Sequence, residues 1–229
     1  IMSNNLTNNS RVKVKVKKGS KSVSSRRWLE RQLNDPYVIA AKEDGYRSRS
    51  AYKLIELNNK FKFLKKGNIV IDLGAAPGGW SQVAAKIIGL PKNGKLVSVD
   101  IQDIMPIEGV YFINGDIMDE DIIETIKNKL QCQVDIVLSD MAPSASGHRN
   151  TDQTRALLLA ELALDTAKHL LQKDGTFCCK LIRGKGEEEL VSSMRSFFSS
   201  IKRYKPESSR KNSAEIFLIG LNFNDQNLA

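Results

Sequence analysis

Short apolar runs alternate with longer amphipathic stretches along most of this chain. The runs are rich in Val, Ile and Leu and end at glycine or at polar residues, which is typical of buried strands. The stretches between them repeat apolar residues at helical spacing, and strands separated in this way need crossover connections. The pattern therefore predicts an α/β fold with a mostly parallel sheet and helices on both faces. We expect strands at 68–73, 95–100, 110–114, 134–139, 176–182 and 215–221, and helices at 50–60, 79–88, 119–130, 154–171 and 187–198.

The N-terminal region differs from this pattern in composition and charge. The chain has 229 residues and a net charge of +9, and residues 1–31 contain nine basic residues and one acidic residue. We predict that residues 1–27 form a basic, flexible arm and that residues 28–229 form a single domain. The alternation of Val and Lys at 11–18 is also compatible with an edge strand. An organellar transit peptide is a weaker interpretation than an RNA-binding arm, because no Arg-containing amphipathic helix is evident there.

Composition excludes several classes of protein. The chain contains no run of about 18 apolar residues, so we predict no membrane span. Three cysteines without a C-x-x-C spacing favour a reducing compartment, which we take to be the cytoplasm. The two histidines are far apart in sequence, so we predict no metal site. The excess of basic residues instead favours a polyanionic partner such as nucleic acid.

The clearest local motif is an apolar strand that runs into a glycine-rich turn, Ile69-Val-Ile-Asp-Leu-Gly-Ala-Ala-Pro-Gly-Gly-Trp80. Gly74, Gly78 and Gly79 allow positive φ and a close approach of backbone N–H groups to a ligand. The turn lacks the Gly-Lys-Ser/Thr of a P-loop and the G-x-G-x-x-G spacing of a dinucleotide site. It therefore favours a mononucleoside-like ligand, and a tight strand-to-helix turn without a ligand is the alternative.

Two acidic residues that close the following strands strengthen the ligand hypothesis. Asp100 ends the strand after the glycine-rich turn, where a carboxylate can accept hydrogen bonds from both hydroxyls of a ribose. Asp116 follows the next strand and could accept a hydrogen bond from an adenine amino group, although a capping role for the next helix is a rival interpretation. Together these residues indicate a site for an adenosine-containing cofactor.

The strand rhythm, the glycine-rich turn and the strand end Ser139-Asp-Met-Ala-Pro143 resemble S-adenosylmethionine-dependent methyltransferases. More narrowly, the chain resembles the FtsJ (RrmJ) family of RNA 2′-O-ribose methyltransferases. The likeness extends from the Ser-Ser-Arg-Arg-Trp-Leu segment at 24–29, through Arg-Ser-Arg-Ser-Ala-Tyr-Lys-Leu at 47–54, to Ser-Ser-Arg-Lys-Asn-Ser-Ala-Glu at 208–215. It implies a Rossmann-like, seven-stranded fold, S-adenosyl-L-methionine as cofactor, and a uridine of large-subunit (23S) ribosomal RNA as substrate during ribosome biogenesis.

Methyl transfer to a ribose hydroxyl needs a group that accepts the hydroxyl proton. Lys180 lies in an apolar strand, where an ammonium group is costly unless it has a partner, and a lysine that extends its amine to solvent is the alternative. Asp140 follows the strand at 134–139 and could orient Lys180, although a turn-forming role before Pro143 is possible for it. The residue pattern alone predicts that Lys53 and Glu215 are ordinary exposed side chains.

The family resemblance assigns roles to these four residues. It implies a catalytic tetrad in which Lys180 accepts the proton, Asp140 and Glu215 hold Lys180, and Lys53 positions the ribose or helps to keep Lys180 neutral. The same resemblance places cofactor contacts at five positions. These are Gly78, Trp80, Asp100, Asp116 and Asp140.

Basic residues are concentrated in three segments that could hold RNA by its phosphates, namely the N-terminal arm, residues 46–49 and residues 195–211. We predict ribosomal RNA or the large ribosomal subunit as the partner, and a monomeric enzyme. A methyltransferase that acts on a base nitrogen is disfavoured, because the fourth strand end lacks the usual paired proline and stacking aromatic residue. A nicotinamide dehydrogenase is disfavoured by the glycine spacing. A non-catalytic RNA-binding assembly factor is the alternative from another class.

Overall fold

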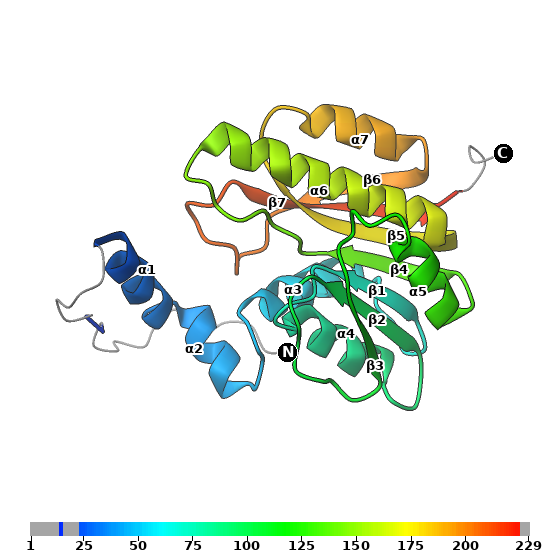
Figure 1. Ribbon diagram of the computed structural model, residues 1–229, viewed down its shortest axis with the longest axis horizontal. Helices are drawn as coiled ribbons and strands as arrows, with labels where there is room; N and C mark the ends of the chain where they lie inside the picture. Colours follow the sequence, from blue (N-terminus) through cyan, green and yellow to red (C-terminus); the bar gives the residue numbers. More distant parts are fainter. Residues whose placement is uncertain (1–13, 16–22, 225–229) are drawn as a thin grey trace.

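The computed structural model describes residues 14–15 and 23–224 and is built around one seven-stranded sheet (Figure 1). The strand order is β3-β2-β1-β4-β5-β7-β6. Strands β1 to β5 pair in parallel, and β7 is antiparallel to both of its neighbours. The strands are β1 (Ile69–Leu73), β2 (Lys95–Asp100), β3 (Val110–Asn114), β4 (Val134–Ser139), β5 (Leu171–Ile182), β6 (Phe198–Tyr204) and β7 (Glu215–Phe223).

Helices cover both faces of the sheet, as the sequence pattern predicts. On one face lie α3 (Ser50–Phe61) and α4 (Gly79–Ile88), whose apolar side chains form a core with Trp80 and Phe217. On the other face lie α5 (Ile122–Leu130), α6 (Arg149–Leu170) and α7 (Glu187–Arg195), which bury a second core. The sheet separates these two cores, so that β1 and β4 are buried from both sides.

The sequence-based prediction missed one strand and misplaced some element ends. Strand β6 occupies part of the region that we expected to be helix and a basic RNA-binding segment. Helix α7 ends at Arg195 instead of at Phe198, and α6 begins at Arg149, before the expected start at Thr154. β6 is one of the two edge strands, so its outer side is not covered by another strand, and its exposed positions carry polar and basic residues. That composition hides the strand from a search for apolar runs.

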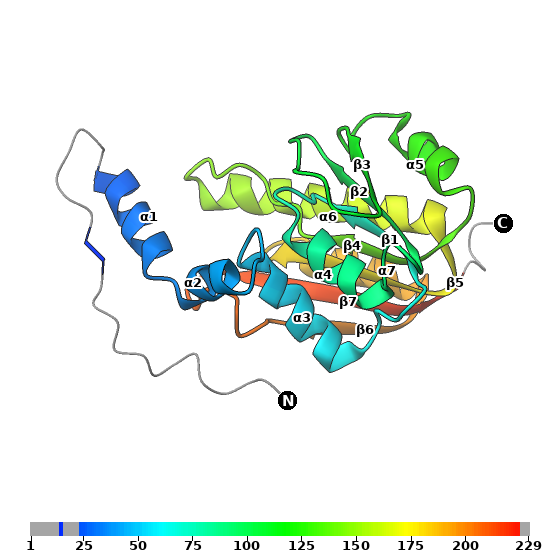
Figure 2. The same ribbon diagram turned by 90° about the horizontal axis from the view of Figure 1, so that it is seen from below.

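Two N-terminal helices, α1 (Val23–Leu33) and α2 (Pro36–Glu43), extend from one end of the sheet (Figure 2). Asp35 caps α2: its side chain accepts a hydrogen bond from the N–H of Tyr37 at 3.1 Å, and Pro36 occupies the first helical position. The predicted boundary between arm and domain, at residues 27 and 28, falls inside α1. Most of the Val–Lys segment lies outside the described residues. Of it, only Val14 and Lys15 are described, and the backbone of Val14 exchanges two hydrogen bonds with the Asn34 side chain.

The order of the strands places a crevice at their carboxyl ends. β1 and β4 are neighbours, but the helices that follow them, α4 and α6, cover opposite faces of the sheet. The connections therefore diverge there, and ligands of open α/β sheets bind at such a point. The glycine-rich turn follows β1 and Asp140 follows β4, so both lie at this edge. Within the described residues, no helix is long and apolar enough to cross a membrane.

Candidate active site

Two cavities, of about 380 Å³ and about 510 Å³, are lined by three of the four residues of the expected tetrad. Lys53 and Glu215 line the smaller cavity, and Asp140 lines the larger one. We call the larger one the acidic cavity, because its walls include four aspartates and no lysine or arginine. Its lining comes from the ends of β1, β2 and β4 and the segments that follow them, from the segment that follows β3, and from Leu159 of α6. The acidic residues are Asp100, Asp103, Asp116 and Asp140.

The glycine-rich turn is shaped by contacts that other residues would disturb. Gly74 has a φ of 73°, and a Cβ atom added there would lie 2.5 Å from the side chain of Met141. Gly78 has a φ of 107° and occupies the N-cap position of α4. Asp100 ties the turn to β2: one carboxylate oxygen accepts the N–H of Ala76 and the other accepts the N–H of Gln102, both at 2.8 Å. Each oxygen keeps a lone pair for a ligand hydroxyl.

The other predicted cofactor contacts have different environments. Asp116 lines the acidic cavity, and one of its carboxylate oxygens also accepts the N–H of Met118 at 3.0 Å, which forms a local turn. The rival interpretation of a helix cap is wrong, because α5 begins at Ile122 and Asp121 occupies its N-cap position. Gly78 and Trp80 are not part of the cavity wall. The Trp80 side chain is buried against Phe217, and its indole N–H donates to the carbonyl of Ser50 at 2.9 Å. The predicted cofactor contact of Trp80 is therefore restricted to its backbone.

A buried carboxyl group lies beneath the turn, at Asp72 in β1. The hydroxyl of Ser81 donates to one of its oxygens at 2.6 Å and lies 2.9 Å from the hydroxyl of Ser98, while the other carboxylate oxygen has no hydrogen-bond partner. Complete burial raises the pKa of Asp72 to about 7 against the opposing effect of the Ser81 hydrogen bond, and the charges of Asp140 and Asp100 raise it further. No sequence pattern predicted the burial of this carboxyl group.

Strand register brings the catalytic candidates together. Ser139 of β4 pairs with Cys179 of β5, so Asp140 and Lys180 follow on neighbouring strands. The amine of Lys180 lies 2.9 Å from a carboxylate oxygen of Asp140 and also donates to the Asp140 carbonyl. Lys180 pairs across β5 and β7 with Phe217, two residues after Glu215, so the side chains of Glu215 and Lys180 project from the same face.

Lys53 and Glu215 form the second ion pair of the site. The amine of Lys53, on α3, lies 2.7 Å from a carboxylate oxygen of Glu215 and 5.7 Å from the centre of the Phe217 ring. Their side chains are only 11% and 15% exposed, so the expectation of ordinary surface residues from the pattern alone was wrong. Burial acts to raise the pKa of Glu215, but the charge and hydrogen bond of Lys53, together with the Lys180 charge, outweigh it and lower that pKa.

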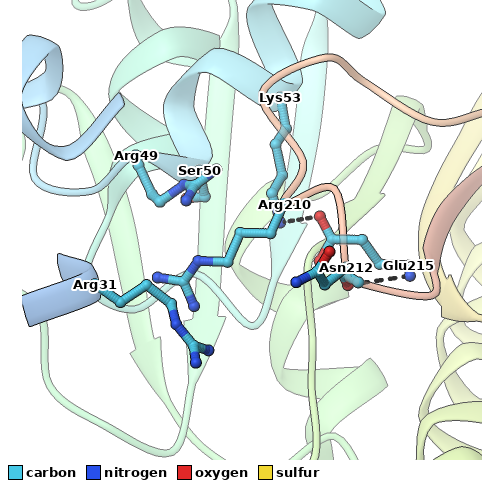
Figure 3. Close-up of a pocket in the computed structure, with 8 residues that line it drawn as sticks. Arg31, Arg49, Ser50, Lys53, Arg210, Asn212 and Glu215 are labelled. Atoms are coloured by element: carbon cyan, nitrogen blue, oxygen red, sulfur yellow. Dashed lines mark hydrogen bonds and ion pairs between the residues drawn. The ribbon is translucent and has the colours of Figure 1, made fainter. Parts of the chain in front are cut away.

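The smaller cavity is basic, and we call it the basic cavity (Figure 3). Four cationic side chains and one carboxylate line it, and they come from α1, from the start of α3, from the loop between β6 and β7 and from the first residue of β7. The lining consists of Arg31, Arg49, Ser50, Lys53, Arg210, Asn212, Ser213 and Glu215. The ion pair of Lys53 and Glu215 thus forms part of its wall, while Asp140 forms part of the wall of the acidic cavity. Lys180 lines neither cavity, but its amine is paired with Asp140 and its charge acts on Glu215.

A network that we did not predict holds the wall of the basic cavity. The guanidinium group of Arg49 donates to the Asp35 carboxylate and to the carbonyl of Ser208. On α3, Glu56 accepts the N–H groups of Glu207 and Ser208 at 2.6 and 2.9 Å, which fixes the loop between β6 and β7. These partners are up to 159 residues apart in sequence, so no local motif could reveal them. In the described part of the chain, no cluster of three or more potential metal ligands is present.

Comparisons with known proteins agree with this geometry. Residues 46–223 match the FtsJ-like methyltransferase family, and the chain belongs to that family. A relative from Rickettsia bellii, named ribosomal RNA large subunit methyltransferase E, is 49% identical over 96% of this chain and 99% of its own length. A relative of the same name from Xanthobacter autotrophicus is 47% identical over 93% of this chain and 84% of its own length.

Structural comparison gives the same result. A crystal structure described as a ribosomal RNA methyltransferase from Plasmodium falciparum has a TM-score of 0.67 and 34% sequence identity, and the match covers 78% of this chain and 98% of that one. The predicted family and the Rossmann-like methyltransferase fold are therefore confirmed, and the chain is an RNA methyltransferase by family. The family match begins at residue 46, after α1 and α2.

Proposed function

We propose that this protein transfers a methyl group from S-adenosyl-L-methionine to the 2′-hydroxyl of a uridine in 23S ribosomal RNA, in the cytoplasm and as part of ribosome biogenesis. The observation that carries the proposal is the placement of two buried lysine–carboxylate pairs between an acidic and a basic cavity. The relatives named ribosomal RNA large subunit methyltransferase E support the choice of substrate.

The chemistry of the acidic cavity supports this cofactor. S-adenosyl-L-methionine carries a sulfonium and an amino group, both positive, and a ribose with two free hydroxyls. The four aspartates of the acidic cavity, with no lysine or arginine beside them, favour a positively charged ligand. They disfavour cofactors that carry a pyrophosphate, because its negative charges would be repelled. Asp100 would hold the ribose hydroxyls, Asp116 would accept from the adenine amino group, and Asp140 would lie closest to the reacting groups. Gly78 and the backbone of Trp80 would contribute at the start of α4.

The four tetrad side chains would align and deprotonate the RNA hydroxyl. When bound, the cofactor supplies an electrophilic methyl group. Lys180 in its neutral form would accept the hydroxyl proton as the oxygen–carbon bond forms, and Asp140 would keep its amine in place at the edge of the acidic cavity. On the other side, Lys53 held by Glu215 would position the ribose. Phosphates of the RNA would lie over the basic cavity.

Transfer of a labelled methyl group tests this proposal. Large ribosomal subunits from a methylation-deficient strain would be incubated with tritiated S-adenosyl-L-methionine and either the wild-type protein or the Lys180→Ala variant. We expect label on a single ribose in the wild-type reaction and a loss of about a thousandfold in rate for the variant, since this is the typical contribution of a positioned base. Cofactor affinity should stay within a few-fold, as measured by calorimetry.

Lys168→Ala is the matched control, because Lys168 is also a lysine paired with an aspartate, on the surface of α6. Its rate should equal that of the wild-type protein. Label on a base instead of a ribose would refute 2′-O-methylation. Cofactor binding without transfer to any subunit or RNA would favour the non-catalytic assembly factor.

A further inference from the structure

The basic cavity contains more positive charge than its partners neutralise. Lys53 is paired with Glu215, and Arg49 is paired with Asp35, whose side chain is 8% exposed. Arg210 donates to Gln32 at 3.1 Å and shares the Asp35 carboxylate, with its Nε 3.6 Å from it. Four cations therefore face two carboxylates, and two positive charges have no matching anion within the cavity.

Arg31 differs from the other arginines of the basic cavity. It is exposed, and the structure gives its guanidinium group no ion pair or hydrogen bond with any described residue. Its side chain nevertheless extends from α1 toward Arg210, over the same space that Lys53 and Glu215 border (Figure 3). A planar guanidinium group with unused donors, next to a second one, suits the oxygens of a phosphate.

Polar contacts of α1 and α2 explain how Arg31, on a helix outside the family match, comes to line the basic cavity. Asp35 caps α2 and at the same time binds Arg49 at the start of α3, and Gln32 near the end of α1 binds Arg210. Helices α1 and α2 are thus connected by polar contacts to both sides of the basic cavity. The matched family region, residues 46–223, contains neither helix.

We propose that α1 and α2 complete the substrate site and that Arg31, together with Arg210, binds the phosphate that flanks the target ribose. The inference rests on the proposed function, since the neighbouring Lys53 and Glu215 define where that ribose would lie. It assigns a substrate-binding role to a segment that could otherwise be regarded as an appendage. RNA is favoured over an acidic peptide because the cavity adjoins the residues that would hold the ribose.

Arg31→Gln removes this contact without removing a partner of any described residue. We expect the affinity for unmethylated large subunits to fall by about tenfold at moderate salt, and the slope of log affinity against log salt to decrease by about one. The cofactor affinity should match that of the wild-type protein. Arg31→Lys keeps the charge but loses the fork geometry, so it should recover part of the affinity.

Lys42→Gln is the matched control, because Lys42 is an exposed cation on the neighbouring helix α2 that does not line the cavity. It should leave both affinity and salt slope unchanged. If Lys42→Gln lowers affinity as much as Arg31→Gln, the effect comes from net charge and the inference is wrong. Unchanged affinity of Arg31→Gln, in a preparation whose wild type methylates normally, would also overturn it while leaving the proposed function intact.

A neutral methylphosphonate at the mapped target site identifies the phosphate. In a short RNA that the wild-type protein binds, this replacement should lower the affinity of the wild-type protein. It should have little further effect on the affinity of Arg31→Gln, because the phosphate and Arg31 are expected to interact with each other. Additive losses would show that Arg31 contacts something else. A loss of affinity seen with subunits and not with the RNA alone would indicate a ribosomal protein as the partner, against the inference. Absence of any methyl transfer by the wild type would instead count against the proposed function.

Discussion

The acidic and basic cavities border the same tetrad but are built in opposite ways. The acidic cavity is formed by consecutive strand ends and the turns that follow them, and backbone N–H groups hold its main carboxylate, Asp100. The basic cavity is formed by three segments that are far apart in sequence, and ion pairs between side chains hold its walls. One region is therefore defined locally and the other by the completed fold. The difference matches the proposed ligands, a small cation and a large polyanion.

Glu215→Gln tests the basic cavity. Of the three substitutions Glu215→Gln, Asp100→Ala and Asp72→Asn, it should have the largest effect on function. It leaves the buried ammonium group of Lys53 without a charged partner, so we expect methyl transfer to fall by about a hundredfold and cofactor affinity to stay within a few-fold. Glu188→Gln is the control, because Glu188 is an exposed glutamate paired with Arg203. If Glu215→Gln lowered cofactor affinity by about as much as it lowers methyl transfer, the two cavities would not be functionally separate.

The lowered pKa of Glu215 adds a stability test to the same variant. A depressed carboxylate pKa contributes stability above the ordinary value of 4.5, and that contribution is lost as pH falls through the folded-state value. The difference in Tm between wild type and Glu215→Gln should therefore be present at pH 7 and shrink below about pH 4. A difference that does not change with pH would show that the ion pair does not contribute to stability.

Asp100→Ala tests the acidic side. Loss of hydrogen bonds to a charged acceptor should raise the Kd for S-adenosyl-L-methionine by about thirtyfold, with affinity for the large subunit unchanged. Asp103→Ala is the control, because it also removes one negative charge from the acidic cavity. In the wild-type protein the Asp103 carboxylate accepts a hydrogen bond from the Asn114 side chain at 3.1 Å, and we assign it no contact with the ribose. We expect a change of less than about threefold for this control. Equal effects of the two variants, measured by calorimetry, would mean that general charge and not a ribose clamp binds the cofactor.

Asp72→Asn should have the smallest effect on function, because the buried carboxyl group lines neither cavity. Its raised pKa of about 7 means that ionisation destabilises the folded state progressively from about pH 4 to about pH 7. The variant should therefore gain Tm relative to wild type as pH rises over this range, by about 10 °C, and the difference should be constant above it. Asp165→Asn, at an exposed carboxylate, should show no such trend. A pH-independent difference for Asp72→Asn would contradict the raised pKa.

Much of the fold could be predicted because its central elements have clear local signals. The bounds of α4, β2, β3 and β4 agree with the sequence pattern, since each of these strands is an apolar run closed by a polar residue and α4 starts directly after the glycine turn. Strand β6 was missed because its exposed positions carry polar and basic residues, whereas β3, at the opposite edge of the sheet, is an apolar run. The start of α6 was misplaced because its first turn, Arg149 to Asp152, is polar throughout.

The site could be predicted only in part from the residues themselves. The glycine turn and Asp100 have recognisable positions at strand ends, and the structure places both beside the acidic cavity. Lys53 and Glu215 were identified by family resemblance, because burial of each depends on the other and on the loop that Glu56 holds. The contact between Asp35 and Arg49 depends on the orientation of α2, which no short sequence pattern specifies.

The separation of the two cavities has a consequence for the order of events in turnover. No residue lines both of them, and the Lys180–Asp140 and Lys53–Glu215 pairs lie between them. Either ligand can therefore enter or leave without displacing the wall of the other. Under the proposed function, we therefore expect the demethylated cofactor to exchange while the ribosomal particle stays bound, and the kinetics to follow random addition and release instead of an obligatory sequence.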